Sequence, residues 1–192
     1  WGADVAVLSR GPGKLAAAPL RGYYTLLRSD INDAEETVAA IKSFGPDIIY
    51  HLAAHPDAAE NQSQATQALT TNGIGTLNVL EGARAAGTSL FIYADSTKAY
   101  GAAAVPYDAS TPLQPACSYA IGKVTGWEMC RLYQRIAGIK VVSIRPALTY
   151  GPRQAPNLIS YVMGLVDRGE RRIVLDGGSQ TRDPLFVKDV VD

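Results

Sequence analysis

The segment Asp47–Ala54 reads Asp-Ile-Ile-Tyr-His-Leu-Ala-Ala and directly follows a helix-stopping Gly45-Pro46 pair. Its run of apolar residues is nearly continuous, which is typical of a parallel strand buried on both faces. Strand-length apolar runs alternate with helical patterns along the rest of the chain. This alternation indicates parallel strands joined by right-handed helical crossovers. We therefore expect an α/β fold with a doubly wound parallel sheet.

The limits of the expected elements follow from the same patterns. Gly45, Gly87 and Gly138 each end a helical pattern just before an apolar run, as a C-terminal helix cap does. The expected strands are Val5–Ser9, Tyr24–Leu27, Asp47–Ala53, Leu90–Asp95, Lys140–Arg145 and Arg172–Leu175, and the expected helices are Asp33–Phe44, Ser63–Ala86, Ser118–Ala137 and Pro156–Arg168.

Composition narrows the classes of function. The 192 residues are 47% apolar and carry 18 basic and 18 acidic side chains, so the formal net charge is zero. This balance favours neither nucleic acid nor an anionic membrane as a partner. Cys117 and Cys130 have neither the spacing of a metal site nor that of a disulfide framework, which is typical of a cytoplasmic protein. His51 and His55 are four residues apart but fall at a strand end without a third ligand, so we expect no metal.

The segment Ser118–Lys123 carries the chemistry. On a helix, Tyr119 and Lys123 would share a face, and a nearby ammonium would lower the pKa of the tyrosine. A tyrosine tuned in this way can exchange a proton with a substrate hydroxyl. Because ligands bind at the carboxyl ends of parallel strands, Ser96, which follows the strand expected before this helix, is a candidate partner. The alternative is an exposed Tyr/Lys pair and a serine that only stabilises a turn.

Ordered motifs make the sequence resemble a known family, the extended short-chain dehydrogenase/reductases that include NAD(P)-dependent nucleotide-sugar epimerases and dehydratases. The matching segments occur in the family's order along almost the whole chain: Asp30-Ile31, Asp47–Ala54, Asn72–Glu81, Ser96 with Tyr100-Gly101, Tyr119–Lys123, Arg145-Pro146, Tyr150–Pro152 and Gly178–Asp183. The resemblance implies a Rossmann-like fold, with residues 1–150 forming part of an NAD(P)-binding domain and residues 151–192 beginning the substrate-binding lobe.

The resemblance also assigns roles to individual residues. Tyr119 would be the acid/base, Lys123 would lower its pKa and hold the nicotinamide ribose, and Ser96 would bind the oxygen that becomes a carbonyl. The implied substrate-binding residues are Ser96, Thr97 and Arg182, the last on the diphosphate. The implied cofactor-binding residues are Arg10, Asp30, Ile31, Leu52, Ala53, Ala54, Asn72, Tyr119, Lys123, Pro146 and Ala147.

Arg10 bears on the choice of cofactor, because NAD-preferring members carry an acidic residue there. An arginine suits a 2′-phosphate, so NADP is favoured weakly over NAD. Asp30 has an alternative role as a helix cap. Gly122 and Gly126 are expected to leave a flat helix face for close packing, and this helix commonly builds a homodimer in the family.

Departures from the family pattern bear on the substrate. Thr97-Lys98 replaces the Asp-Glu pair of dehydratases, which argues against dehydration, and Asp95 stands where serine is usual. We expect an epimerase-like enzyme that oxidises a nucleotide sugar transiently. Leu148, in place of the asparagine of epimerases, keeps open an NADP-dependent reductase of a smaller carbonyl compound. A non-catalytic dinucleotide-binding sensor is the other alternative.

The resemblance further predicts a sheet that is incomplete at both ends. Family members open with a strand and a glycine-rich turn that holds the pyrophosphate. No such motif precedes Trp1, and Gly11-Pro12-Gly13 lies in the wrong place for it. We therefore expect this chain, as a fragment, to bind dinucleotide weakly, to be inactive alone and to form a homodimer only at full length.

Overall fold

The computed structural model describes residues 2–11, 23–56, 60–154, 157–175 and 183–192. The chain divides into two compact units, Trp1–Arg145 and Pro146–Asp192, and each is described by itself. The predicted domain boundary after residue 150 lies a few residues beyond this division, at the end of a short strand.

All strand pairs in the first unit are parallel. Strands β1 (Ala6–Ser9) and β2 (Thr25–Arg28) form one pair. Strands β3 (Ile48–His51), β4 (Leu90–Ala94) and β5 (Lys140–Ile144) form a second sheet in the order β3-β4-β5. The first five expected strands are thus confirmed: β2 lies one residue later than predicted, and the others are shorter at one or both ends by up to two residues. The parallel ladders bring the carboxyl end of each strand to the same edge of its sheet.

Helix ends follow the signals in the sequence. Helix α1 (Ala34–Phe44) begins after Asp33, whose side chain accepts a hydrogen bond from the Glu36 amide at 2.9 Å. It ends at Gly45, which adopts the left-handed conformation (φ 66°). Helices α3 (Gly75–Ala86) and α4 (Ser118–Ala137) end in the same way at Gly87 and Gly138. The predicted helix stops are therefore confirmed.

The helix predicted over 63–86 is not continuous. It consists of α2 (Gln62–Ala68), a π-helical turn η2 (Leu69–Ile74) and α3. Asn72 lies within the π turn and is fully buried, and its side chain pairs with the backbone of His55. The Thr76 hydroxyl donates to the Asn72 carbonyl at 2.7 Å. These hydrogen bonds pair polar groups of a turn that lacks the regular α-helical bonds. The spacing of apolar residues in the sequence gives no sign of this turn.

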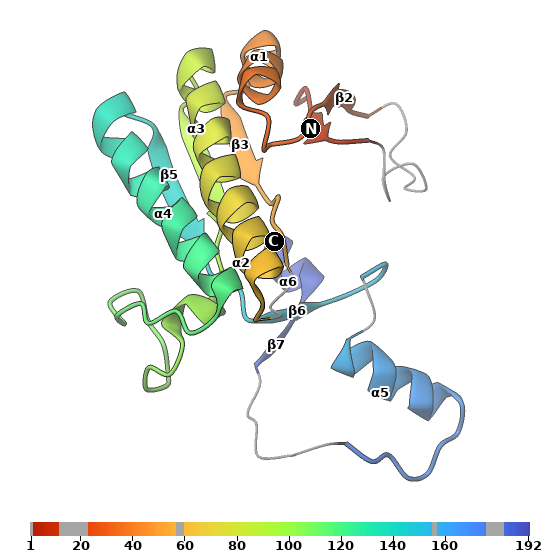
Figure 1. The fold of residues 1–192 in the computed structure, drawn as a ribbon. Helices are drawn as coiled ribbons and strands as arrows, with labels where there is room; N and C mark the ends of the chain where they lie inside the picture. Colours follow the sequence, from red (N-terminus) through yellow and green to blue (C-terminus); the bar gives the residue numbers. More distant parts are fainter. Residues whose placement is uncertain (1, 12–22, 57–59, 155–156, 176–182) are drawn as a thin grey trace. The chain divides into compact units, whose positions relative to one another are not determined.

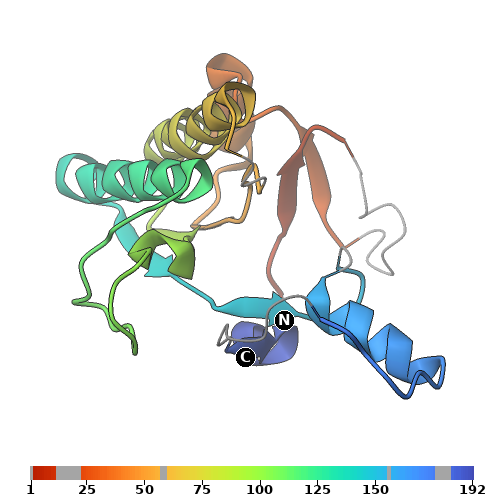
Figure 2. The same cartoon turned by 60° about the horizontal axis from the view of Figure 1, so that its bottom comes forward.

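One face of the β3-β4-β5 sheet carries the core. Phe91 and Tyr93 of β4 are fully buried and pack against Leu80 of α3 and Cys130 of α4. Helices α3 and α4 lie side by side (Figure 1, Figure 2), and the Tyr133 hydroxyl bonds Glu81 between them.

The other face of this sheet is apolar and exposed. Tyr50 of β3 and Val142 and Ile144 of β5 point to it, with exposed fractions of 65%, 47% and 41%. The expectation that these strands are buried on both faces is therefore wrong for the part of the chain that the structure describes.

Gly122 and Gly126 let α4 approach η2 closely. A Cβ atom on Gly122 would stand 2.6 Å from the Ala68 carbonyl oxygen, and one on Gly126 would stand 2.5 Å from the Asn72 carbonyl oxygen. The flat helix face predicted at these glycines packs within this chain.

The second unit pairs β6 (Leu148–Tyr150) with β7 (Pro184–Phe186), again in parallel. Its helices are α5 (Leu158–Asp167), whose cap Asn157 forms a reciprocal capping box with Ser160, and α6 (Val187–Val191). The strand predicted at Arg172–Leu175 is wrong, because this segment joins no ladder among the described residues. Across the described ranges, no helix is both long and apolar enough to cross a membrane.

Candidate active site

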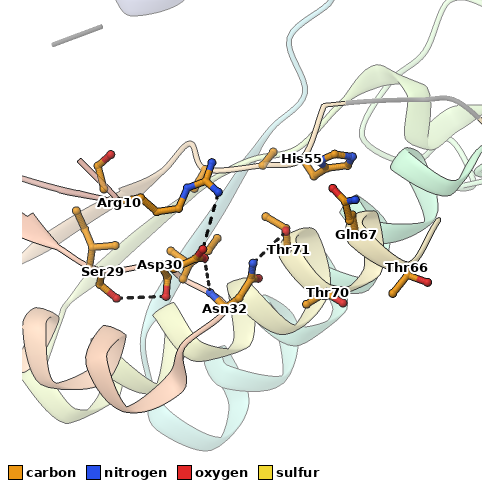
Figure 3. A pocket seen from close by; sticks show the side chains of 14 residues that line it. Arg10, Ser29, Asp30, Asn32, His55, Thr66, Gln67, Thr70 and Thr71 are labelled. Carbon is orange, nitrogen blue, oxygen red and sulfur yellow. Dashed lines mark hydrogen bonds and ion pairs between the residues drawn. The ribbon is translucent and has the colours of Figure 1, made fainter. Parts of the chain in front are cut away.

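A pocket of about 520 Å³ opens at the carboxyl ends of β1, β2 and β3 (Figure 3). This volume lies within the range of ordinary small-molecule sites. Small side chains, Ala53 and Ala54, line it after β3 and leave room for close approach of a ligand. Its polar lining comes from the strand ends and from α2 and η2: Ser9, Arg10, Ser29, Asp30, Asn32, His55, Thr66, Gln67, Thr70 and Thr71.

Arg10 and Asp30 face each other at this pocket (Figure 3). An Arg10 Nη1 atom lies 3.9 Å from Asp30 Oδ2, and the two side chains are 82% and 41% exposed. A pair this exposed holds its partners weakly. Asp30 Oδ1 accepts the Asn32 amide at 3.0 Å, so Asp30 closes a turn, and Asp33 rather than Asp30 caps α1. The alternative role of Asp30 as a helix cap is therefore wrong.

The π turn directs the Asn72 side chain toward the backbone of His55, where it has a structural role. Its Oδ1 accepts the His55 amide at 2.7 Å and its Nδ2 donates to the His55 carbonyl at 3.2 Å. These bonds fix the segment after β3 that carries Ala53 and Ala54. Asn72 supports the pocket from behind and is not among the residues that line it.

Ser96 and Tyr119 form the second part of the site. Ser96 follows β4 and caps the short helix η3 (Thr97–Tyr100), where its hydroxyl accepts the Lys98 amide at 3.2 Å. The same side chain lies close enough to the half-buried Tyr119, in the first turn of α4, to lower the pKa of that tyrosine. The sequence predicts that this hydroxyl converges with both Tyr119 and Lys123 on one substrate oxygen, and this convergence stays a prediction.

The pKa of Tyr119 does not move as the sequence predicts. Burial raises it above its ordinary value near 10, the nearby Ser96 side chain lowers it, and the charges of Asp95 and Cys117 raise it again. Lys123 is not one of the groups that shift it. The cation over the Tyr119 ring is instead Lys98, whose Nζ lies 5.4 Å from the ring centroid. The predicted lowering of the Tyr119 pKa by Lys123 is therefore wrong for this structure.

Lys123 points into the protein from the next turn of α4. It is 2% exposed, its Nζ donates to the Ala94 carbonyl at 2.6 Å, and it lies 4.9 Å from the centroid of the Tyr93 ring. Burial lowers the pKa of Lys123 to about 8, although the charge of Asp95 opposes this shift. The ammonium has three donors, so two stay available beyond the bond to Ala94.

Asp95 and Arg145 form an ion pair beneath Ser96. The Asp95 side chain is fully buried, and its Oδ2 accepts Arg145 Nε at 2.5 Å. In the sequence, Asp95 stands out only because it departs from the family pattern. Its partner Arg145 follows a strand 50 residues later, and no repeat in the sequence predicts this pairing.

His51 and His55 bind protein groups. His51 Nε2 lies 2.9 Å from the Thr76 hydroxyl oxygen, and His55 Nε2 lies 2.5 Å from Gln64 Oε1. Burial, with a smaller effect of the Lys123 charge, lowers the pKa of His51 to about 3, so this ring is neutral.

The remaining predicted residues fall in several places. Ile31 lines the pocket and also belongs to the core, whereas Leu52 is 72% exposed and does not line it. Pro146 and Ala147 belong to the second unit, before β6. Arg182 lies outside the described residues. Sequence reasoning missed the lining residues contributed by α2 and η2, because threonine and glutamine in a helix carry no distinctive signal: Thr66, Gln67, Thr70 and Thr71.

Comparisons with known proteins agree with this geometry. The family model described as "NAD dependent epimerase/dehydratase family" matches residues 2–192. A UDP-glucose 4-epimerase of Mycolicibacterium smegmatis is 33% identical over 175 residues, which cover 88% of this chain and 56% of the epimerase. A probable dTDP-glucose 4,6-dehydratase of Sinorhizobium fredii is 28% identical over 192 residues, 92% of this chain and 55% of the dehydratase.

Solved structures show the same fold. The UDP-glucose 4-epimerase of Thermotoga maritima with UDP-glucose has a TM-score of 0.85 at 27% identity, covering 99% of this chain and 63% of that one. The UDP-glucose 4-epimerase of Thermus thermophilus in complex with NAD has a TM-score of 0.81 at 27% identity, covering 98% and 64%. The expected Rossmann-like α/β fold is confirmed.

The chain spans about half the length of the relatives it matches in sequence. The match of the family model covers almost every residue of the chain. The motifs from Asp30 to Lys123 supply a strand-end pocket, a serine–tyrosine pair and a buried lysine in one unit. This chain belongs to the NAD dependent epimerase/dehydratase family.

Proposed function

We propose that this chain carries the catalytic groups of an epimerase-like oxidoreductase that oxidises a nucleotide sugar transiently and then reduces it again. The observation that carries the proposal is the closeness of Ser96, at the end of β4, to Tyr119 in the first turn of α4, near enough to lower the pKa of the tyrosine. UDP-glucose is the first substrate to test, because the similar epimerases are named for it.

Each catalytic group has one task in this proposal. When bound, NAD or NADP accepts a hydride from the sugar and later returns it. Tyr119, as the phenolate, takes the proton of the sugar hydroxyl during oxidation and, as the phenol, returns it during reduction. Ser96 donates a hydrogen bond to the oxygen that becomes the carbonyl. The Lys123 ammonium, bonded to the Ala94 carbonyl, would donate a further hydrogen bond to the ribose of a bound cofactor.

The strand-end pocket fits the adenosine half of a dinucleotide. Among the described residues, Asp30 Oδ2 is approached only by Arg10, at 3.9 Å, so it can accept a hydrogen bond from an adenine amino group. Thr97 and Arg182 are proposed to contact the sugar nucleotide, and Pro146 and Ala147 the nicotinamide side. We propose that the protein acts as a homodimer.

Arg10 supports a weak preference for NADP over NAD. Its guanidinium is mostly exposed and weakly paired, so a 2′-phosphate could bind it in place of Asp30. We expect Arg10→Ala to weaken NADP binding by about tenfold, the loss of one charged contact, and to leave NAD binding unchanged. Equal losses for both dinucleotides in calorimetric titrations would contradict the preference.

The catalytic proposal is tested by turnover of UDP-glucose to UDP-galactose in the complete protein that contains this chain, because the chain alone is expected to be inactive. We expect Tyr119→Phe to lower kcat by roughly 10²–10⁴-fold, the usual contribution of a general acid/base. The control is Tyr23→Phe, which alters an exposed tyrosine outside the pocket and the Ser96–Tyr119 pair.

Three outcomes contradict this proposal. Turnover that Tyr119→Phe leaves unchanged contradicts the role of the tyrosine. Net consumption of reduced cofactor with a small carbonyl compound, without sugar inversion, favours the reductase. Dinucleotide binding without any turnover in the complete protein that contains this chain favours the sensor.

A further inference from the structure

Asp95 is a buried carboxylate with an unusual set of partners. Burying such a charge is unfavourable unless hydrogen bonds and an opposite charge compensate it. Asp95 Oδ1 accepts the Ser96 backbone amide at 2.8 Å. Its Oδ2 accepts Arg145 Nε at 2.5 Å and the Ser143 hydroxyl at 3.1 Å. One carboxylate therefore links the backbone of Ser96 to the end of the neighbouring strand β5.

Arg145 extends this link to the segment before α4. Its guanidinium lies 5.3 Å from the Tyr100 ring centroid and 5.8 Å from that of Trp127. Its Nη1 donates to the Tyr100 hydroxyl at 3.2 Å, and this hydroxyl donates to the Asp108 carbonyl at 3.1 Å. Tyr100 is the last residue of η3, the helix that Ser96 caps. Both ends of η3 are thus held by the Asp95–Arg145 pair.

We propose that Asp95 is a positioning residue of the active site. It holds Ser96 through the Ser96 backbone amide, and it holds η3 through Arg145. It also places a buried negative charge beside Lys123 and Tyr119. This inference rests on the proposed function, since it gives Asp95 a task only if Ser96, Tyr119 and Lys123 take part in the reaction.

The charge of Asp95 acts on both catalytic side chains of α4. It raises the pKa of Lys123 against the larger lowering by burial, and it raises the pKa of Tyr119. Asp95 therefore keeps Lys123 cationic at neutral pH, while it disfavours ionisation of Tyr119. The titratable and charged groups around Asp95 come from β4, η3, α4 and β5: Tyr93, Tyr100, Tyr119, Lys123, Cys130 and Arg145.

The test is a titration of the Lys123 amine by NMR in the whole chain labelled with ¹³C,¹⁵N-lysine, with the signal assigned by Lys123→Arg. In Asp95→Asn we expect the midpoint to fall below the value of about 8. The protonated fraction at pH 8 should drop from about one half to about one tenth, the result of losing an opposite charge nearby. The matched control is Asp167→Asn, an exposed aspartate at the end of α5, which should leave the midpoint unchanged.

Two further variants guard against misfolding of Asp95→Asn, which leaves the Arg145 charge unpaired. Asp95→Asn with Arg145→Gln removes both charges and should also lower the midpoint. Arg145→Gln alone leaves the carboxylate in place and should raise it. A midpoint that stays at the wild-type value in any of these folded variants overturns the inference.

The titration needs neither cofactor nor substrate, so its result is separate from the turnover assay. A shifted midpoint in the chain, with no turnover by the complete protein that contains it, would support the charge of Asp95 beside Lys123 and contradict the proposed function. Turnover with an unchanged midpoint in Asp95→Asn would keep the function and exclude this role for Asp95.

Discussion

At the scale of single residues, His51 is held neutral in the core, stacked on Tyr93 with ring centroids 5.8 Å apart. Its pKa is about 3 in the folded chain, against an ordinary value of 6.5. Between these two values the unfolded chain binds more protons than the folded chain. The contribution of neutral His51 to the free energy of unfolding is therefore fully present above pH 6.5, and it is lost as the pH falls toward 3.

We expect the free energy of unfolding to decrease by about 2 kcal/mol between pH 7 and pH 5 because of His51. His51→Gln should remove this part of the pH dependence, and His55→Gln, the control at the other histidine of the chain, should keep it. Urea unfolding at the two pH values measures the difference. An equal pH dependence in both variants would contradict burial of His51.

The sequence predicted the meeting of Ser96 with Tyr119, because strand ends and the first turn of the following helix converge in parallel α/β sheets. It did not predict the direction of the Lys123 side chain. Helical spacing places Lys123 one turn from Tyr119, but the choice between the phenol and the Ala94 carbonyl depends on packing against Tyr93. The Asp95–Arg145 pair depends on strand register in the same way.

At the scale of elements, close packing of α4 on η2 depends on Gly126. A Cβ atom there would stand 2.5 Å from both the Asn72 carbonyl oxygen and the Tyr93 hydroxyl oxygen. We expect Gly126→Ala to destabilise the chain by about 1–3 kcal/mol, although alanine favours a helix. The measurement is urea unfolding followed by fluorescence of Trp127, which lies on the same helix.

Gly164→Ala is the matched control for this change. Gly164 lies within α5, and the nearest atom to an added Cβ would be Arg168 Nη1 at 3.5 Å, an ordinary contact. The control should leave the Trp127 transition unchanged. A Gly126→Ala chain as stable as the wild type would show that α4 and η2 are less closely packed than in the structure.

Helix ends could be predicted because a glycine at the end of a helix is visible in the sequence. Strands that form only by pairing with another strand could not be predicted. Gly45, Gly87 and Gly138 adopt the left-handed conformation at helix ends, which glycine accepts readily. Arg172–Leu175 has the length and composition of a strand but lacks a partner among the described residues. The paired strands β6 and β7 are three residues each, too short to leave a periodic pattern.

At the scale of the whole molecule, the exposed apolar face of the β3-β4-β5 sheet gives a direct prediction. Contiguous apolar surface binds the dye ANS. Val142→Lys should reduce ANS fluorescence of the chain by roughly half, because the charge falls within this face. Val105→Lys, in an exposed loop, is the matched control and should change it little. Equal fluorescence in both variants would contradict exposure of this face.

The number of residues in the π turn η2 sets the rotation of α2, which lines the pocket, relative to α3. Each π-type hydrogen bond spans one residue more than an α-type bond. Deleting a single residue from Leu69–Ile74 would restore regular winding, and α2 would swing by about 100° around its axis relative to α3. Thr66 and Gln67 would then turn out of the pocket wall. A one-residue deletion could thus leave the helix content intact and still dismantle the binding surface.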